Sequence, residues 1–416
     1  MGSSALRRSR PVRTLVRKLG VHRVVAVTNL VQYPLLRLLA ASVGRVPRDP
    51  RLLVFGATLD RFADNAAYLY LHLSAHRSDT AVRPVWVSGS SDLVRRLRSL
   101  GLEAHTRWSR AGLVACLRAG SYVYSGYASD INRFTAAGAR RVCLWHGIGL
   151  KRLTERAGVR PSSLRERIAR AGQETPPDVF LSSTDLVTRR IFSPAFGVPP
   201  EHCWEVGYPR NDHLVRGDPP PPALVTDPET WTLLRAAPQV VGLFLTWRDD
   251  RVDDLVDDAV LSGLADLCRQ RGARLAYKAH YNVSPATRLP ESCTLLPTDA
   301  DLHAYLGLCD VVVTDYSSIS FDFMLTRRPV VYFMPDLERY LEDRGLYFDP
   351  HDVPGEVVRT RDQLLHVVGE RLDGVPAPWD DGDDAFVREI WGDYDGHACE
   401  ALACRLTPGT PAARRS

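Results

Sequence analysis

The sequence contains eight cysteines, but it has no CxxC pair and no regular spacing between them. Disulfide frameworks and zinc sites usually show such spacings, so we expect reduced thiols and no metal site. The basic start is not followed by a compact apolar core and a small-residue cleavage site, which argues against a secretory signal peptide. We therefore expect the protein to act inside the cell.

Long uninterrupted apolar runs are also missing. The most apolar stretch, residues 24–43, is interrupted by four unfavourable residues, Asn29, Gln32, Pro34 and Arg37. A transmembrane helix is therefore not predicted. The apolar residues of this stretch repeat at helical period, and seven Arg and Lys residues crowd positions 7–23. Residues 1–48 are predicted to be a basic, amphipathic membrane-associating segment, and a helix packed on the protein's own core is the alternative.

The length of 416 residues exceeds what one hydrophobic core usually organises. From residue 49 onward, short apolar runs alternate with helical stretches in two sets that flank a proline-rich stretch. This alternation predicts an α/β fold with two Rossmann-like domains that face a central cleft. The predicted parts are a first domain at 49–217, a linker at 218–235, a second domain at 236–405 and a tail at 406–416.

The segment DVVVTDYSSISFDF is the most informative part of the second domain. It reads as a buried strand that ends at Thr314 and Asp315, followed by Ser317 and Ser318 at the start of a helix. Ligands of open α/β sheets bind at the carboxyl ends of strands, and a helix start attracts phosphate. The alternative is that Ser317 only caps the helix.

Polar and cationic residues follow three other predicted strands. They occur in the motifs GYPRND, TWRDD and YKAH and comprise Arg210, Asn211, Thr246, Arg248, Lys278 and His280. Arginine offers a planar fork for phosphate oxygens and lysine offers a point charge, so the group would suit a diphosphate. Each cation alone could equally form a surface ion pair, as Arg248 could with Asp249.

The segment LWHGIGLKRL places His146 directly after a predicted strand. An acceptor hydroxyl attacks phosphorus poorly unless a base removes its proton, and an imidazole is matched to that task near neutral pH. A histidine at such a place can also be purely structural. The segment therefore indicates either a general base or a packed ring.

Taken in order, these segments resemble the signature of the CDP-glycerol glycerophosphotransferase family, which includes teichoic acid primases and polymerases. The resemblance runs from about Arg51 to Leu402. It implies a GT-B-like fold, a CDP-activated polyol donor, membrane association, and neither a metal nor another cofactor. It also implies catalytic roles for His146 and His280, and donor-phosphate contacts for the segment from Asp315 to Ser318.

The sequence departs from the family pattern at two places beside these histidines. Ile148 and Gly149 stand where the family commonly has threonine and proline, and Tyr281 stands where it commonly has proline. Both histidines are retained. The predicted phosphotransfer reaction is therefore unchanged, whereas the identity of the acceptor and of the polyol is left open.

The resemblance implies that glycerol phosphate, or ribitol phosphate, passes from its CDP ester to a hydroxyl of a membrane-linked teichoic acid or capsule precursor. CMP would be released at the cytoplasmic face of the membrane, where an anionic surface would hold the protein. His146 would be the base, and His280, Arg210 and Arg248 would bind the donor diphosphate. Alternatives are a GT-B glycosyltransferase that uses a nucleotide sugar, and a catalytically silent nucleotide-binding scaffold. No nucleic-acid partner is expected.

Overall fold

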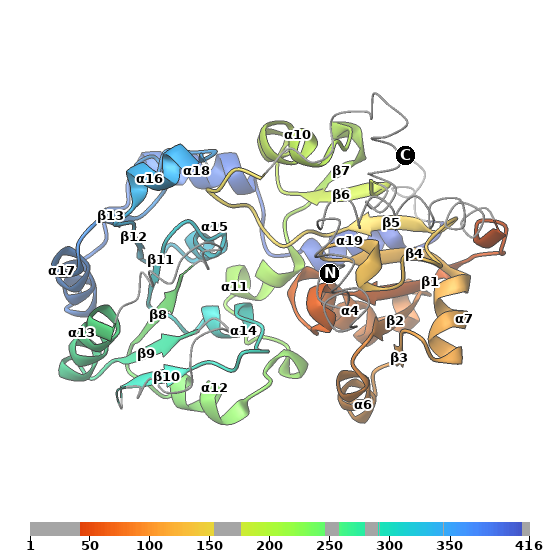
Figure 1. Ribbon diagram of the computed structural model, residues 1–416, viewed down its shortest axis with the longest axis horizontal. Coiled ribbons are helices and arrows are strands. Elements are labelled where there is room, and N and C mark those ends of the chain that lie inside the picture. Colours follow the sequence, from red (N-terminus) through yellow and green to blue (C-terminus); the bar gives the residue numbers. More distant parts are fainter. Residues whose placement is uncertain are drawn as a thin grey trace, which may run out of the picture.

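The computed structural model describes residues 42–153, 176–245, 258–278, 290, 292–343 and 345–409. Within these residues the chain forms two α/β domains that lie side by side (Figure 1). The predicted amphipathic stretch lies almost wholly outside the described residues, and Thr246, Arg248 and His280 lie outside them as well.

The first domain is built on a parallel sheet with the strand order β3-β2-β1-β4-β5-β6-β7. Its central strands consist of apolar runs that are buried on both faces, as expected for a sheet covered by helices on both sides. The strands are β1 (Asp49–Gly56), β2 (Arg83–Ser88), β3 (Ala104–Thr106), β4 (Ala119–Tyr124), β5 (Arg140–Cys143), β6 (Val179–Ser182) and β7 (Cys203–Glu205).

The second domain repeats this arrangement with the strand order β10-β9-β8-β11-β12-β13, again all parallel. In both sheets the first strand of the domain lies in the middle, and the order reverses beside it, as in Rossmann folds. The predicted α/β class is confirmed. The strands are β8 (Val240–Phe244), β9 (Arg274–Tyr277), β10 (Cys293–Leu295), β11 (Val311–Thr314), β12 (Val330–Phe333) and β13 (Glu356–Val358).

The helices connect successive strands, and several begin at a side chain that caps the first turn, such as Ser90 before α6 and Thr360 before α17. Those of the first half are α4 (Asp64–Ala75), α5 (Arg77–Thr80), α6 (Ser91–Ser99), α7 (Arg110–Arg118), α9 (Asp185–Val187), α10 (Ser193–Phe196) and α11 (Asp212–Arg216). Those of the second half are α12 (Pro228–Arg235), α13 (Asp258–Gln270), α14 (His303–Leu306), α15 (Ile319–Phe323), α16 (Leu337–Asp343), α17 (Arg361–Leu372), α18 (Asp381–Trp391) and α19 (Ala398–Leu406).

Short 3₁₀ helices complete the connections, and the π-helix η3 (Thr188–Phe192) joins α9 to α10. The 3₁₀ helices are η1 (Thr58–Asp60), η2 (Ala128–Asp130), η4 (Pro200–His202), η5 (Pro209–Asn211), η6 (Pro222–Leu224) and η7 (Met324–Thr326). The predicted linker at 218–235 thus contains η6 and helix α12, because the proline run ends at residue 222 and a helix capped by Asp227 follows.

The larger cluster of buried apolar side chains extends from the first domain into the second. It joins residues such as Phe55 and Trp86 of the first sheet to Phe321 and Trp391 of the second half of the chain. A separate, smaller cluster fills the space between the second sheet and helices α13 and α17. The two domains therefore share buried apolar surface and do not pack only through polar contacts.

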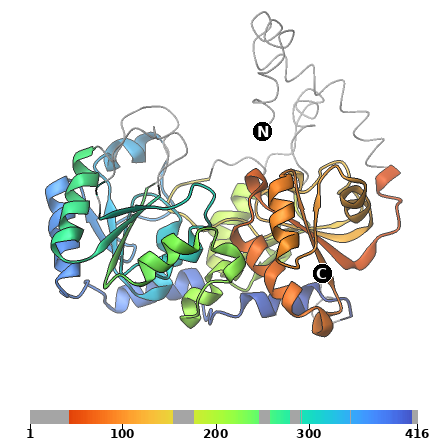
Figure 2. The ribbon, with the colours of Figure 1, turned by 90° about the horizontal axis from the view of Figure 1, so that it is seen from below.

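The C-terminal helix crosses back to the first domain (Figure 2). Helix α19 packs against α4. The carboxylate of Asp212 accepts hydrogen bonds from the backbone N–H groups of Ala398 and Cys399, both at 2.9 Å, and so satisfies the free donors at the start of α19. The predicted domain boundaries assign this helix to the second domain, but it lies on the first, because its cap comes from the GYPRND motif.

The structure pairs no two of the eight cysteines in a disulfide. Their reduced state stays a prediction. Among the described helices, none combines the length and apolarity that a bilayer-spanning helix needs.

The attachment of the C-terminal segment can be tested at Gly207. This residue has a φ of 77°, and a Cβ added to it would lie 2.4 Å from the ring of Tyr394, whose hydroxyl is bonded to Asp212 at 2.6 Å. We expect Gly207→Ala to lower the free energy of unfolding by about 3 kcal/mol. Gly217→Ala is the matched control, since its φ is 70° and its Cβ would meet nothing within 4 Å.

The control should cost about 1 kcal/mol, which is the backbone penalty alone. Urea denaturation of both variants measures the difference. Equal losses in the two variants would contradict the close packing of Tyr394 on Gly207.

Candidate functional site

The segments that follow strands β5 and β11 meet between the domains. His146 follows β5 of the first sheet, and Ser317 and Ser318 follow β11 of the second. A Cβ on Gly147 would lie 3.0 Å from the hydroxyl of Ser318, and a Cβ on Gly149 would lie 3.6 Å from the Cβ of Ser318. The structure thus brings the predicted base and the predicted phosphate-binding segment together.

The loop that carries His146 has an unusual backbone. Trp145 has a φ of 51°, which is uncommon for a residue with a side chain, and Gly147 has a φ of 135°. A Cβ on Gly147 would also lie 2.8 Å from a guanidinium nitrogen of Arg210. Glycine is therefore required at position 147, both for its backbone angle and for the close approach of Arg210 and Ser318.

The imidazole of His146 is exposed, and its centroid lies 3.8 Å from that of the Trp145 ring. The surrounding protein atoms disfavour the charged ring and lower the pKa of His146. Asp64 opposes this shift, Arg210 adds to it, and a backbone hydrogen bond with Ser125 opposes it. The ring is therefore neutral near pH 7 and able to accept a proton.

Asn65 holds the backbone next to His146, a role that the sequence did not reveal. Its fully buried amide donates to the carbonyl oxygens of Leu144 at 3.1 Å and Trp145 at 3.0 Å. Its side-chain oxygen accepts from the backbone N–H of Arg210 at 3.2 Å. One side chain at the start of α4 thus ties the His146 loop to the GYPRND motif.

Arg210 was predicted to bind the donor, and the structure places it in a buried ion network. Its guanidinium donates to Asp64 at 2.8 Å, to the carbonyl oxygen of His146 at 2.8 Å, and to Asp322 of helix α15 at 2.7 Å. Only 2% of Arg210 is exposed. In this arrangement Arg210 connects the His146 loop to the second domain and has no open surface for a ligand.

The network continues behind Asp322. His303 approaches Asp322 at 3.1 Å and Asp301 at 3.3 Å with its two ring nitrogens, and Asn211 donates to Asp322 at 2.6 Å. Burial alone would raise the pKa of Asp322, but Arg210 and His303 outweigh it and hold that pKa below its usual value. Burial and Arg210 would lower the pKa of His303, whereas both aspartates raise it, and the result is a raised pKa.

The predicted residues of the second domain differ in exposure. Thr314 is fully buried and donates to the carbonyl oxygen of Phe244 at 2.6 Å, so its hydroxyl joins β11 to β8. Asp315 is buried too, whereas Ser317 and Ser318 are partly exposed at the start of α15. The Ser317 hydroxyl accepts from the backbone N–H of Ile319 at 3.4 Å, but the N-cap residue of α15 is Ser318, whose side chain makes no capping bond.

Lys278 follows β9 and is partly exposed. Its ammonium group donates to the carbonyl oxygen of Ala300 at 2.5 Å, and burial lowers its pKa to about 8. The remaining predicted residues, Thr246, Arg248 and His280, lie outside the described part of the chain, and their roles stay predictions.

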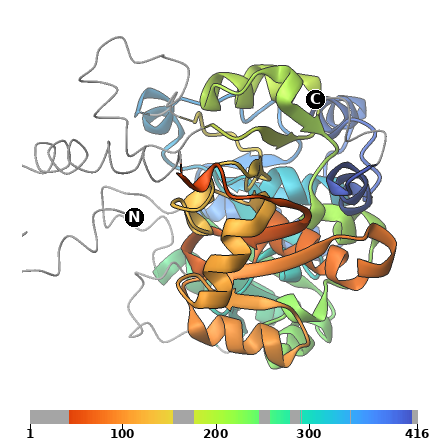
Figure 3. The same ribbon diagram turned by 90° about the vertical axis from the view of Figure 1, so that its right-hand side faces the viewer.

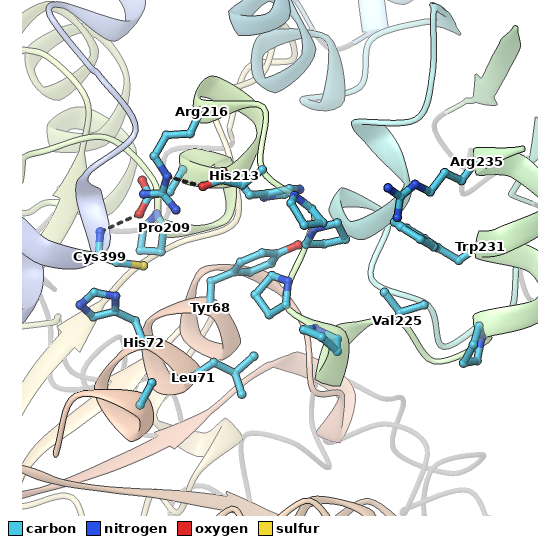
Figure 4. A pocket seen from close by; sticks show the side chains of 18 of the residues that line it. Tyr68, Leu71, His72, Pro209, His213, Arg216, Val225, Trp231, Arg235 and Cys399 are labelled. Carbon is cyan, nitrogen blue, oxygen red and sulfur yellow. Dashed lines mark hydrogen bonds and ion pairs between the residues drawn. The ribbon is translucent and has the colours of Figure 1, made fainter. Parts of the chain in front are cut away.

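A separate pocket of about 700 Å³ lies on the other side of the Arg210 motif, between α4, the proline-rich linker and α12 (Figure 4). Tyr68 and Leu71 line one wall, and Trp231 lines another. None of the predicted site residues lines it, so it is distinct from the place where the His146 loop meets Ser318.

Asp64, Asn65, Asp301 and His303 were missed by sequence reasoning. Their positions in the sequence are nonetheless recognisable. Asp64 and Asn65 follow β1 in the segment RFADNAA, and Asp301 and His303 stand at the start of a helix in TDADLHAYL. Acidic and amide residues at such places are usually read as helix caps. Their use in an interdomain network depends on the distance between two parts of the chain that the sequence does not give.

The energetic importance of the network can be tested at Asp322. In Asp322→Ala, Arg210 and His303 would each lose a charged partner inside the protein, and we expect the free energy of unfolding to fall by about 3–5 kcal/mol. Asp185→Ala removes an ion pair with Arg189 whose side chains are both 64% exposed, and should cost less than about 1 kcal/mol. Denaturant titration compares the two, and similar losses would contradict a buried interdomain clamp.

Comparisons with known proteins agree with this architecture. The family model described as CDP-glycerol:poly(glycerophosphate) glycerophosphotransferase matches residues 38–375. The teichoic acid glycerol-phosphate transferase of Staphylococcus aureus is 24% identical over 366 residues, which cover 82% of this chain and 89% of that protein. The teichoic acid poly(glycerol phosphate) polymerase of Staphylococcus epidermidis is 29% identical over 275 residues, which cover 62% of this chain but only 37% of that protein.

Among solved structures, the wall teichoic acid polymerase TagF superposes with a TM-score of 0.69 at 23% identity, covering 92% of this chain and 95% of that chain. This likeness confirms the GT-B-like fold that the sequence predicted. Because the family model spans most of both domains and includes the His146 and Ser317 segments, the chain belongs to the CDP-glycerol:poly(glycerophosphate) glycerophosphotransferase family.

Proposed function

We propose that the protein transfers glycerol phosphate from CDP-glycerol to a hydroxyl of a membrane-linked teichoic acid precursor and releases CMP. The observation that supports this most directly is the contact between the His146 loop of the first domain and the Ser317–Ser318 segment of the second. A base on one domain and a phosphate-binding segment on the other are the two parts that a phosphotransferase of this family needs. Ribitol phosphate is the other polyol that the site could accept.

In the proposed reaction the neutral imidazole of His146 takes the proton of the acceptor hydroxyl. The hydroxyl oxygen then bonds to the phosphorus that carries the glycerol, and the bond from this phosphorus to the CMP oxygen breaks. The leaving CMP gains negative charge. Lys278 and the predicted donor residues His280, Arg248 and Thr246 would stabilise that charge, together with the hydroxyls of Ser317 and Ser318.

Arg210 and Asn211 have a different proposed role. Because the guanidinium of Arg210 binds the carbonyl oxygen of His146 and the carboxylate of Asp322, it would set the distance between base and donor. Asn211 supports the same carboxylate at 2.6 Å. Both would thus act as positioning residues and not as phosphate ligands.

The acceptor and the location are proposed from the same family. A lipid-linked precursor requires a protein at the membrane surface, and the seven cations of residues 7–23 would be attracted to anionic lipid at the cytoplasmic face. The protein would then be a peripheral membrane enzyme.

The proposed function is tested by product analysis. The full-length protein is incubated with CDP-glycerol and, separately, with CDP-ribitol, together with a soluble analogue of the lipid-linked acceptor. We expect CMP release that depends on the acceptor, and a higher rate with CDP-glycerol. Release of UDP or GDP from a nucleotide sugar would identify a glycosyltransferase instead, and no release from any donor would indicate a scaffold.

The role of His146 gives a kinetic prediction. His146→Ala should lower kcat by about 10²–10⁴ while donor affinity changes only a few-fold, because a general base contributes to the transition state and little to ground-state binding. In the wild type, kcat/KM should fall as the pH drops through a value below 6.5, since the pKa of His146 is lowered and the protonated ring cannot act as a base. This acid limb should be absent from the residual activity of the variant.

His351→Ala serves as the control, because His351 is exposed and belongs to neither the His146 loop nor the ion network. It should keep both the rate and the pH profile of the wild type. Near-normal turnover in His146→Ala would remove this residue from the mechanism.

A further inference from the structure

Helix α7 of the first domain carries an exposed group of aromatic, apolar and cationic side chains. Trp108, just before the helix, is 61% exposed, which is the highest value for a large apolar side chain among the described residues. Val114 on the helix is 50% exposed, and Phe134 beside it is 38% exposed. We call this group, together with its three neighbouring cations, the α7 patch, which comprises Trp108, Arg110, Val114, Arg118, Arg133 and Phe134.

The members of the α7 patch are close together. The ring centroids of Trp108 and Phe134 are 5.9 Å apart, and the guanidinium of Arg133 lies 5.1 Å from the Phe134 centroid. Arg110, Val114 and Arg118 are spaced by four residues and so lie along one face of α7. Figure 1 places α7 on the side of the first domain away from the second domain, and Figure 3 looks onto that side.

The aromatic residues sit on a rigid base. The buried side of this region is tied together by Arg107, which donates to the carbonyl oxygens of Asp130 at 2.5 Å and Ile131 at 2.6 Å, and to the carboxylate of Asp60 at 2.6 Å. The loops after β1, β3 and β4 are thereby linked. The exposure of Trp108 and Phe134 is thus a property of a well-connected surface and not of a loose loop.

The stretch of chain that carries the α7 patch is rich in cations, and two of them, Arg107 and Arg141, pair with Asp60 and Asp178. Between residues 104 and 153 the chain has eight Arg and Lys residues but one acidic residue, Asp130, which is buried. In the described part of the chain, Arg110, Arg118 and Arg133 form no ion pair with a carboxylate. These cations are available to an anionic surface.

The predicted membrane-associating segment enters the first domain beside the patch. Arg48 donates to the carbonyl oxygens of Thr135, next to Phe134, and of Cys116, at the end of α7. A Cβ on Gly138, in the same loop as Phe134, would lie 3.1 Å from the backbone of Gly44. The described end of that segment, residues 42–48, therefore lies beside the patch.

We propose that the α7 patch binds an anionic lipid bilayer, with Trp108 and Phe134 inserted at the level of the headgroups and the three arginines on lipid phosphates. Tryptophan and other aromatic rings favour the boundary between water and hydrocarbon, and cations add attraction to anionic lipid. A large exposed apolar group rimmed by polar residues is also what a contact surface requires. The inference extends the proposed function, because a lipid-linked acceptor must be reached at the bilayer.

The patch would also orient the active site. The loop from β4 to β5 begins at Ser125, whose backbone is hydrogen-bonded to His146, and the same loop carries Phe134. A protein seated on the membrane through this loop would hold His146 at a set height above the lipid. The N-terminal segment would supply attraction, and the patch would supply orientation.

The direct test is fluorescence quenching by lipids brominated on the acyl chain. Full-length wild type and Trp108→Phe are mixed with vesicles of equal parts phosphatidylglycerol and phosphatidylcholine that contain the brominated lipid. The chain has eight tryptophans, and we expect the wild type to be quenched and Trp108→Phe to lose most of that quenching. Equal quenching of the two proteins would show that Trp108 does not enter the bilayer and would overturn the proposal.

Vesicle sedimentation provides the second measurement. Trp108→Ala with Phe134→Ala should weaken binding to the same vesicles by about tenfold, and binding of the wild type should fade as salt rises. The matched control is Leu341→Ala with Val375→Ala, which removes apolar side chains that are 45% and 46% exposed elsewhere, and it should bind like the wild type. Loss of binding to soluble poly(glycerol phosphate) with unchanged vesicle binding would mean that the patch holds the polymer, which also overturns the proposal.

CMP release with the soluble acceptor analogue is measured on every preparation. Trp108 and Phe134 lie outside the proposed catalytic site, so their variants should retain wild-type rates in this assay and slow only on the lipid-linked acceptor. A wild type that releases no CMP but shows quenching at Trp108 would refute the proposed function and leave the membrane surface standing. A wild type that releases CMP without quenching at Trp108 would support the proposed function and refute the proposed membrane surface.

Discussion

The ion pair between Arg210 and Asp322 connects the two domains, and the arrangement of the site depends on it. Both side chains are buried, at 2% and 1% exposure, and the pair is 2.7 Å long. A charge in such a place is tolerated only when it is fully paired. Asp64, the carbonyl oxygen of His146 and His303 complete the pairing, so residues from both domains must lie at their observed positions for the charges to be satisfied.

The unusual backbone at His146 follows from the same constraint. Arg210 approaches the loop so closely that position 147 has no room for a Cβ, and Trp145 accepts a left-handed conformation. Such conformations are costly and persist only where the surroundings hold them. Asn65 supplies that support through two hydrogen bonds to the carbonyl oxygens before His146. The ring is thereby exposed while the backbone before it is held in place.

Charge is used differently inside and outside the protein. In the interior, Arg210 is matched by two carboxylates and serves the packing of the domains. On the outer side of the first domain, the cations of the α7 patch stand beside exposed aromatic rings. The same residue type therefore acts as a structural connector in one place and as a candidate lipid contact in the other, and burial is what separates the two.

The sequence by itself determined the alternation of strands and helices, because buried parallel strands need continuous apolar runs and their connecting helices need caps. It also placed His146, Ser317 and Ser318 at the carboxyl ends of strands, where ligands bind, and its motifs identified the family. Only the tertiary structure decided the environment of Arg210, since an arginine after a strand looks the same in the sequence whether it faces a phosphate or two buried aspartates. The packing of helix α19 on the first domain was decided by the tertiary structure for the same reason: its partners, Asp212 and α4, lie far away in the chain, and periodicity reports on neighbours only.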